Sequence, residues 1–353
     1  MKIGILILLV TLIACSNNSN LKDSKISSNN DLINIIELAS LAPSSHNAQM
    51  WKVKIINENE VNVIWDSSKK LESSDPNNKE ALISIGAFIE NFVEGAKVYG
   101  FDTIVTLSET FGINNEVANL TLVKKEFSNT YNILNNIRNR HTIRESYLDK
   151  ALEENDLNSL LISENIKYFD KNSEQGKYLK NALYESYVKE SYNKNTQQEL
   201  SKWIITSNKE AKNRNDGMRA EMMGMGGIKK YFYYAFINKK SVEEKMFINK
   251  GIEKAKNQSE NCSGYIILTA NSEKNSDFIN LGREFEKLFL IATEKKIAVH
   301  PMSQIFHESP WKDEISEKLN LNNHAELLLR VGYVSEYGKP TSLRNNVNDI
   351  IIF

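Results

Sequence analysis

The stretch SIGAFIENFVEGAKVYGF, residues 84–101, has a counterpart later in the chain, NLGREFEKLFLIATEKKI, residues 280–297. When the two are overlaid, four pairs of small or apolar residues coincide: Gly86 with Gly282, Ile89 with Phe285, Phe92 with Leu288, and Ala96 with Ala292. Their spacing of three, three and four residues predicts one apolar face of a helix in each segment. Each helix carries a glycine near its start, which allows another backbone to approach closely.

The segments around the two helices also match. Strand-like runs precede them, VNVIW at 61–65 and GYIILTA at 264–270, and two more follow each helix, at 102–107 and 118–125 and at 297–302 and 325–333. We interpret this order as an internal duplication with a seam near residue 130, giving halves at 31–130 and 131–353. A chance match between two amphipathic helices is the alternative. The expected class is α+β, with two mixed, mostly antiparallel sheets flanked by helices and related by a pseudo-twofold axis.

Composition sets limits on the class of protein. The chain has 353 residues, with 44 basic and 45 acidic side chains and a net charge of −1. This balance gives no electrostatic support for a nucleic-acid partner. The sequence contains no metal-ligand spacing of a known kind. Cys262 borders an apolar strand, which favours a buried thiol over a catalytic nucleophile.

The N-terminus reads as an export signal. Residues 1–15, MKIGILILLVTLIAC, combine Lys2 with a short apolar run and end in a sequence that resembles a bacterial lipobox, with Cys15 as the lipidated residue. The polar residues 16–30 are typical of a flexible tether. We therefore expect a lipid-anchored protein of the bacterial cell envelope that faces outward; an ordinary buried N-terminal helix is the alternative.

Three further segments between the seam and the second copy of the matched helix are expected to be helical or broken-helical. The first two are residues 150–161 and one long polar helix over 176–204. The third, residues 216–236, is rich in methionine and tyrosine, and its glycines at 224, 226 and 227 should interrupt a helix. This third segment is either a flexible lid over a flat ligand or ordinary packing, and the sequence favours neither.

Polar side chains that could bind a ligand gather at three places. In APSSHN, residues 42–47, Pro43 ends a helix and Ser44, Ser45 and Asn47 follow it; Gln49 lies just beyond. In NIRNRHTIRESY, residues 136–147, a helix would place Arg140 and Arg144 one turn apart, with His141 and Thr142 between them, as suits a phosphate dianion. In the C-terminal tail, Lys339 and Arg344 follow the last strand. A solvated loop, a basic helix end and an exposed basic tail are the respective alternatives.

Together these pieces resemble the nitroreductase family of flavin mononucleotide (FMN) enzymes, and in particular its tandem Acg-like branch, in which two units are fused in one chain. The resemblance covers residues 31–353. It rests on the pattern AxxAPSSHNxQxW at 39–51, the run at 70–87, RHTIR at 140–144, HPMSQ at 300–304, and LLRVGY followed by KP and an arginine. Met50 departs from the pattern, because the family usually has proline there.

The resemblance implies a set of cofactor-binding residues. In ordinary family members two chains pair, and FMN lies at their interface between a basic segment of one chain and a proline-serine loop of the other. Carried over to this chain, the implied residues are Pro43, Ser44, Ser45, Asn47, Arg140, His141, Thr142, Arg144, Met302, Ser303, Gln304, Lys339 and Arg344. The last five come from the segment near the flavin N5 edge and from the C-terminal tail.

Each half retains what the other lacks. No arginine precedes the serine loop of the first half, and residues 156–170 of the second half have no serine loop. We therefore expect one FMN site per chain, formed between the halves of a monomer that acts as an internal pseudo-dimer.

The resemblance implies an FMN-dependent oxidoreductase. Hydride would pass in ping-pong fashion from NAD(P)H or another donor to a small-molecule acceptor, such as a quinone or a nitroaromatic compound, and the flavin N5 would carry the chemistry. Two alternatives stay open: a non-catalytic envelope lipoprotein that binds or stores FMN, and a structural lipoprotein with a degenerate pocket.

Overall fold

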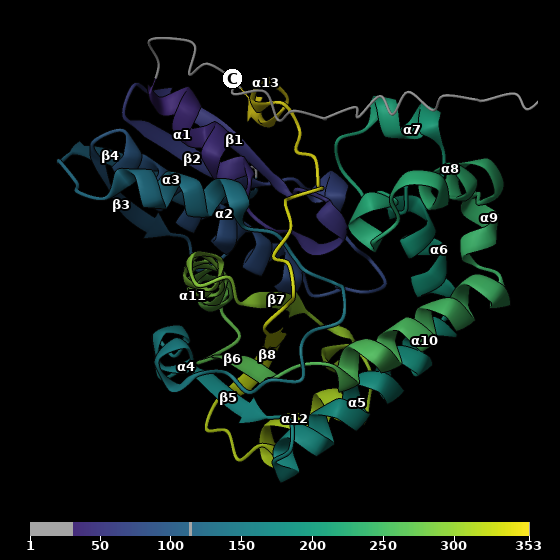
Figure 1. Cartoon of the computed structure of the whole chain (residues 1–353). Coiled ribbons are helices and arrows are strands. Elements are labelled where there is room, and N and C mark those ends of the chain that lie inside the picture. The colour runs from purple at the N-terminus through teal and green to yellow at the C-terminus, as the bar shows by residue number, and fades with distance from the viewer. Residues whose placement is uncertain (1–30, 113–114, 353) are drawn as a thin grey trace, which may run out of the picture.

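The protein contains two β-sheets with helices around them (Figure 1). The computed structural model describes residues 31–112 and 115–352. The first sheet has the strand order β3-β4-β2-β1-β9 and the second has the order β5-β6-β8-β7. Neighbouring strands are antiparallel except for β1 and β9, which are parallel. The expected α+β class with mixed, mostly antiparallel sheets is confirmed.

The two halves repeat one order of elements. The first half contains α1 (Asp31–Ser40), β1 (Trp51–Asn57), β2 (Glu60–Trp65), α2 (Lys79–Val98), β3 (Phe101–Leu107) and β4 (Glu116–Lys124). The second contains α4 (Glu154–Leu160), β5 (Ile166–Asp170), β6 (Gly264–Ala270), α11 (Asn275–Glu294), β7 (Ala298–Pro301) and β8 (His324–Gly332). With β5 to β8 in the places of β1 to β4, the second sheet has the strand order of the first, apart from the additional β9. This agreement supports two fused copies of one unit.

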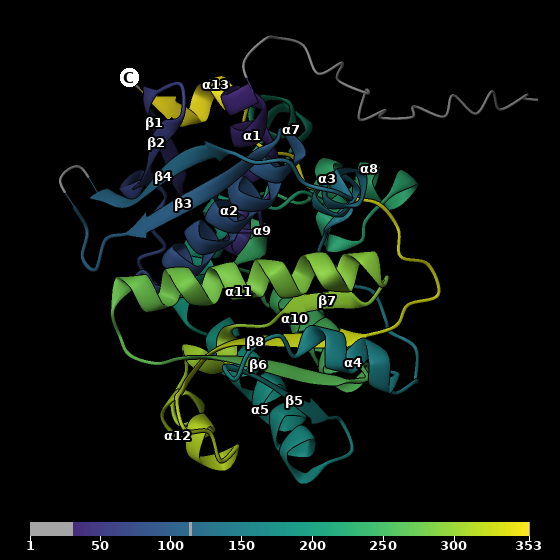
Figure 2. The same ribbon diagram turned by 90° about the vertical axis from the view of Figure 1, so that its left-hand side faces the viewer.

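The two matched helices, α2 and α11, pack against each other at their glycines. A Cβ atom added to Gly86 would lie 2.1 Å from the carbonyl oxygen of Ile279, and one added to Gly282 would lie 2.0 Å from that of Ile83. Figure 2 shows α11 between the two sheets. The helices also share one apolar core, in which Phe88 and Phe289 are fully buried. The backbone approach expected at the glycines is therefore present, and each glycine meets the other helix.

The second half differs from the first by a large helical insertion. A short turn joins β1 to β2, whereas residues 171–263 separate β5 from β6. The insertion contains α5 (Glu174–Ser191), α6 (Lys194–Trp203), α7 (Asn208–Asn213), α8 (Gly227–Phe236), α9 (Lys239–Val242) and α10 (Lys245–Glu260). In Figure 1, α7, α8 and α9 lie on the right-hand side, and α10 runs from them back toward the second sheet, where Arg330 of β8 donates to the carbonyl oxygen of Gln258.

Two helix predictions for the second half need correction. The single long helix expected over 176–204 is two helices, because the side chain of Asn193 accepts hydrogen bonds from the first backbone N–H groups of α6 and starts a new helix. The helix expected over 150–161 is only the short α4. The predicted interruption at the glycines is confirmed: Gly224 has a positive φ of 79°, and α8 begins at Gly227.

The C-terminal segment crosses from the second half to the first. After α12 (Trp311–Lys318) and β8, the chain runs past both sheets to α13 (Val347–Ile350) and β9 (Ile351–Ile352), which pairs with β1 (Figure 1). α3 (Thr130–Asn139) begins at the proposed seam, and the domain boundary there stays a prediction. The signal at 1–15, with Cys15, and the tether at 16–30 lie outside the described residues. None of the described helices has the length and apolar character needed to cross a bilayer.

The contact between α2 and α11 predicts an unusual response to a glycine substitution. In an ordinary helix, Gly→Ala stabilises a protein by about 0.5–1 kcal/mol. In Gly86→Ala the new methyl group would meet the backbone of α11, so we expect the free energy of unfolding to fall by about 1–3 kcal/mol. Urea denaturation of residues 16–353 measures this change.

Gly226→Ala is the matched control, because no atom lies within 4 Å of an added Cβ there. A Gly86→Ala protein as stable as the wild type would contradict the close backbone approach.

Candidate functional site

A cavity of about 60 Å³ lies between the two halves and the insertion. Eight of the residues implied by the family resemblance line it: Pro43, Ser44, Asn47, Arg140, His141, Thr142, Arg144 and Arg344. The other lining residues are His46, Met218, Met222, Thr341 and Ser342. The structure thus brings the serine loop of the first half together with both basic segments of the second. That these residues bind a cofactor stays a prediction.

Packing of α3 explains how the first basic segment reaches the serine loop. Leu38 of α1, Ile137 of α3 and Leu290 of α11 form a small buried cluster. α3 ends at Asn139, and Arg140 has the extended backbone of a residue that follows a helix, with φ −62° and ψ 123°. The helix that would place Arg140 and Arg144 one turn apart is therefore not formed. Both side chains still reach the same cavity, because the chain that follows α3 runs along the wall of this cavity.

The serine loop has an unusual backbone. His46, Asn47 and Gln49 all have positive φ, between 53° and 58°. The side chain of Ser44 holds this turn by accepting a hydrogen bond of 3.0 Å from the backbone N–H of Gln49. Positive φ is uncommon for non-glycine residues, and such strain persists where the surrounding structure enforces it, often at functional sites.

Two arginines meet at the C-terminal end of α1. Arg344 donates hydrogen bonds of 3.0 Å to the carbonyl oxygens of Leu41 and Ala42, and Arg140 also donates to Leu41. The carbonyl groups at a helix C-terminus attract cations. Nε of Arg140 lies 3.0 Å from a carboxylate oxygen of Glu286, which is fully buried.

The pKa values in this group indicate an excess of positive charge. Burial, reinforced by the neighbouring Arg140, lowers the pKa of Arg344 to about 9. Burial raises the pKa of Glu286 to about 8 despite the arginines beside it. Glu286 alone therefore compensates poorly for two guanidinium groups, and within the described part of the chain Nε of Arg344 has no hydrogen-bond partner.

Arg144 adds a third guanidinium to the cavity. Its only side-chain hydrogen bond among the described residues is a long one, 3.5 Å, to the carbonyl oxygen of Met222. Burial lowers its pKa. Since a buried charge is costly unless it is paired, a dianion between the three arginines would be stabilised, and planar guanidinium groups match the oxygens of a phosphate. The residues present therefore fit a phosphate group.

A second cavity of about 230 Å³ shares Arg144 with the first. Its lining consists of Arg144, Glu145, Ser146, Met223, Gly224, Lys254, Asn257, Gln258 and Arg330. Lys254 donates to the carbonyl oxygen of Met223, and burial together with Arg144 lowers its pKa. Arg330 is fully buried and donates to four backbone carbonyl groups, and its guanidinium group lies 3.8 Å from the ring centroid of Tyr147. Neither forms an ion pair with any carboxylate of the described ranges.

Sequence reasoning missed several lining residues. Arg330 had a usable signal, because it is a charged residue inside the apolar run LLLRVG of β8. Lys254 lies on the polar helix α10 and looked like an ordinary surface lysine. Met218 and Met222 belong to the segment whose role the sequence left open, and His46 lies between two residues that were singled out.

Five implied residues line neither cavity: Ser45, Met302, Ser303, Gln304 and Lys339. Met302 is buried in the core of the second half, Gln304 begins a short 3-10 turn, and Lys339 is exposed. The hydroxyl group of Ser45 donates to a carboxylate oxygen of Glu80 at the start of α2, and Ser303 helps to lower the pKa of Glu80. Ser45 therefore ties the serine loop to α2.

Glu80 belongs to a buried network that links three parts of the chain. His307 contacts Glu80 at 2.9 Å through Nε2 and Glu190 of the insertion at 2.8 Å through Nδ1. Burial would lower the pKa of His307, but the two carboxylates raise it to about 11. Burial would raise the pKa of Glu80, but His307 and the serines lower it to about 2. The charged pair thus fixes the base of the serine loop.

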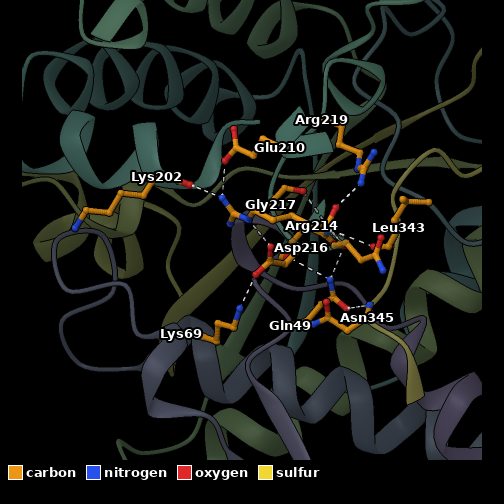
Figure 3. Close-up of polar contacts among 12 residues, drawn as sticks. Gln49, Lys69, Lys202, Glu210, Arg214, Asp216, Gly217, Arg219, Leu343 and Asn345 are labelled. Carbon is orange, nitrogen blue, oxygen red and sulfur yellow. Dashed lines mark hydrogen bonds and ion pairs between the residues drawn. The ribbon is translucent and has the colours of Figure 1, made fainter. Parts of the chain in front are cut away.

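The insertion is also fixed against the serine loop, as Figure 3 shows. Asn47 and Gly217 exchange hydrogen bonds of 3.1 Å, and Gln49 donates to the carbonyl oxygen of Asn215. Asp216 forms ion pairs with Arg214 at 2.8 Å and with Lys69 at 2.5 Å. Residues 214–218 are therefore packed in place, and Met218 forms part of the cavity wall.

The pseudo-twofold axis relates this site to a second position, around Glu90, where the described residues form no equivalent site. Glu90 occupies in α2 the place of Glu286 in α11 and is equally buried. It lies 2.9 Å from Arg283 and 3.5 Å from Lys287, both on α11. Both cations belong to the facing helix and are partly exposed to solvent, so among the described residues no buried arginines converge at that position.

Metal-binding clusters and the free cysteine are two further features considered from the sequence. Within residues 31–112 and 115–352, no group of three His, Cys, Asp or Glu side chains could hold a metal ion. Cys262 is a buried free thiol, as expected, and burial raises its pKa.

The chain matches no protein-family model and no curated protein. Several solved structures are similar to it. They include the FMN-dependent nitroreductase NfnB from Mycobacterium smegmatis in complex with NADPH, at 14% identity over 62% of this chain and 92% of that chain, with a TM-score of 0.37. A nitroreductase with bound FMN from Bacteroides fragilis matches at 14% identity over 62% of this chain and 97% of that chain, with a TM-score of 0.36. A nitroreductase-like protein from Bacillus cereus matches at 14% identity over 62% of this chain and 94% of that chain, with a TM-score of 0.32.

The network around His307 predicts a pH-dependent loss of stability. His307→Gln leaves two buried carboxylates without a cationic partner, so we expect a loss of about 3–5 kcal/mol in the free energy of unfolding. The contribution of the low Glu80 pKa is present above its ordinary value of 4.5 and is lost toward pH 2. The contribution of the high His307 pKa is present below 6.5 and is lost toward pH 11.

The effect of His307→Gln should therefore be largest between pH 4.5 and 6.5 and shrink as the pH rises toward 11. Urea denaturation at several pH values measures it. His324→Gln, at an exposed position, is the control and should change stability by less than about 0.5 kcal/mol. A constant effect across the pH range would show that the charged network is not the cause.

Proposed function

We propose that this protein is an FMN-dependent oxidoreductase of nitroreductase type, with one FMN site per chain. The observation that carries the proposal is the cavity between the halves, where three arginines converge and one buried carboxylate opposes them. The resemblance of the serine loop and the RHTIR segment to the family supports the choice of FMN over other phosphate-bearing ligands. The chain would act as a monomer, because both walls of the site come from one polypeptide.

The phosphate of FMN would bind to Arg140, Arg144 and Arg344, with the hydroxyl group of Thr142 as a further donor. The first cavity is smaller than the roughly 300–1,000 Å³ of typical ligand pockets. FMN would therefore have to extend from the phosphate set into the second cavity. Arg144 lines both, so its position supports this placement.

When bound, the flavin would supply two-electron redox chemistry between a donor and an acceptor. Arg144, Lys254 and Arg330 provide fixed positive charge at the second cavity, which favours a ligand with negative charge on it. The serine loop and the Glu80–His307 pair hold the wall rigid, so that little ordering is needed on binding. No side chain here is required as an acid or a base, because protons can come from solvent.

The donor would be NAD(P)H or another reductant, and the acceptor a quinone, a nitroaromatic compound or a similar small molecule. Lipidation at Cys15 would place the protein on the outward face of a bacterial membrane. Nicotinamide cofactors are scarce there, and this favours a different donor if the anchor is present.

A second candidate function is a non-catalytic envelope lipoprotein that binds or stores FMN. The fixed loop at 214–218 supports it, because Met218 and Met222 close the cavity from the side of the insertion. Little room would remain beside the cofactor for an acceptor.

Visible absorption of purified residues 16–353 separates these functions. After FMN is added and the unbound flavin is removed, we expect a flavin spectrum on the protein, with bleaching when NADH, NADPH or a quinol is added without oxygen. A bound flavin that none of these donors reduces favours storage. A protein that takes up no FMN at all would contradict both.

Substitutions on opposite walls test the shared site. Arg144→Gln removes a charge that binds no carboxylate in the structure, and Ser44→Ala removes a hydroxyl group from the other half. We expect the dissociation constant for FMN, measured by fluorescence titration, to rise about ten- to a hundredfold for Arg144→Gln and to rise for Ser44→Ala as well.

Arg138→Gln is the matched control, because Arg138 is exposed on α3 two residues before Arg140 and lines neither cavity. It should leave FMN binding unchanged. If Arg138→Gln and Arg144→Gln weaken binding equally, the effect is one of general surface charge and the assigned site is wrong.

A further inference from the structure

Helix α8 carries an apolar face that nothing in the described chain covers. Ile228, Tyr231, Phe232 and Phe236 lie three, four and eight residues from the first, which is the spacing of one helix face. Their exposed fractions are 75%, 67%, 51% and 72%. The rings of Phe232 and Phe236 are nearly parallel, with centroids 6.1 Å apart. We refer to these four residues as the α8 patch.

The opposite face of α8 already accounts for the packing of this helix. Tyr233 and Tyr234 are buried and pack with Ile204, Ile205 and Val242 in a separate small core of the insertion. A helix with apolar residues on two opposite faces is normally buried on both. In α8 only one of these faces is buried, and the α8 patch on the other is exposed. Contiguous exposed apolar surface of this kind marks an interaction site.

The surroundings of the α8 patch are basic. Residues 227–250 contain six lysines and two glutamates, in a chain whose net charge is −1. Lys229, Lys240, Lys245 and Lys250 are exposed, and none forms an ion pair within the described residues. Glu243 and Glu244, both exposed, are the acidic neighbours. An aromatic face flanked by lysines is typical of a helix that lies in a membrane interface with anionic lipids.

The position of α8 agrees with a membrane on this side. α1, the first described helix, and α8 both lie in the upper part of the molecule in Figures 1 and 2. Cys15, the residue expected to be lipidated, precedes α1 by sixteen residues. A chain of that length spans at most about 55 Å when extended, so an anchored protein would stay within one molecular diameter of its bilayer.

We propose that the α8 patch docks onto a lipid bilayer with anionic headgroups. Tyr231, Phe232 and Phe236 insert at the boundary between headgroups and acyl chains, and the surrounding lysines contact the headgroups. The patch therefore orients the protein on the membrane, in addition to any lipid anchor. The proposal does not depend on the cofactor.

Flotation with lipid vesicles tests the proposal on residues 16–353, which lack the lipid. Phosphatidylcholine vesicles with phosphatidylglycerol should bind the protein, pure phosphatidylcholine vesicles should bind it less, and added salt should weaken binding. Phe232→Asp combined with Phe236→Asp should lower the partition coefficient by roughly tenfold or more. Both side chains are exposed, so the melting temperature should stay close to that of the wild type.

Tyr131→Asp is the matched control, because Tyr131 is 77% exposed on α3, outside the α8 patch. It should bind vesicles as the wild type does. Two results would overturn the proposal. The first is equal vesicle binding by the wild type and the double variant, whether that binding is strong or absent. The second is a concentration-dependent dimer in sedimentation that the double variant abolishes and Tyr131→Asp does not. The second result would assign the patch to another copy of the chain.

Discussion

The crossing of α2 and α11 at Gly86 and Gly282 is the contact on which the rest of the structure depends. Each glycine lies against the backbone of the other helix, at a distance that excludes any side chain. This close approach joins the two halves into a single apolar core. It also brings α1 of the first half beside α3 and α11, through the small cluster of Leu38, Ile137 and Leu290. The end of α1 and the start of the basic segment are adjacent for this reason, and the cavity forms between them.

The fold could be predicted from the sequence largely because its signals are local. Apolar residues at steps of three and four in two segments identified the paired helices, and short β-branched runs identified the strands around them. The order of elements then indicated a duplication, which the matching strand orders of β1 to β4 and β5 to β8 support. The convergence of Ser44, Arg140, Arg144 and Arg344 was also anticipated, although from resemblance to a family and not from spacing.

The parts that were missed depend on contacts between distant segments. Arg140 and Arg144 are not on a helix, because α3 stops where the chain turns to follow the cavity wall. Lys254 and Arg330 reach the second cavity from α10 and β8, which periodicity alone cannot bring together. The same is true of residues 214–218, whose place is set by Asn47, Gln49 and Lys69. The equivalent buried glutamates Glu286 and Glu90 have different cations beside them: Arg140 lies against Glu286, whereas Arg283 and Lys287 of the facing helix lie against Glu90.

If one cofactor site is assembled from the two halves of a single chain, a monomer must bind one FMN. Sedimentation velocity of residues 16–353 loaded with FMN, detected at both the flavin and the protein absorption, measures this stoichiometry. We expect the flavin to sediment with a monomer at one FMN per chain. Flavin that sediments only with a dimer, or at two per chain, would contradict this expectation.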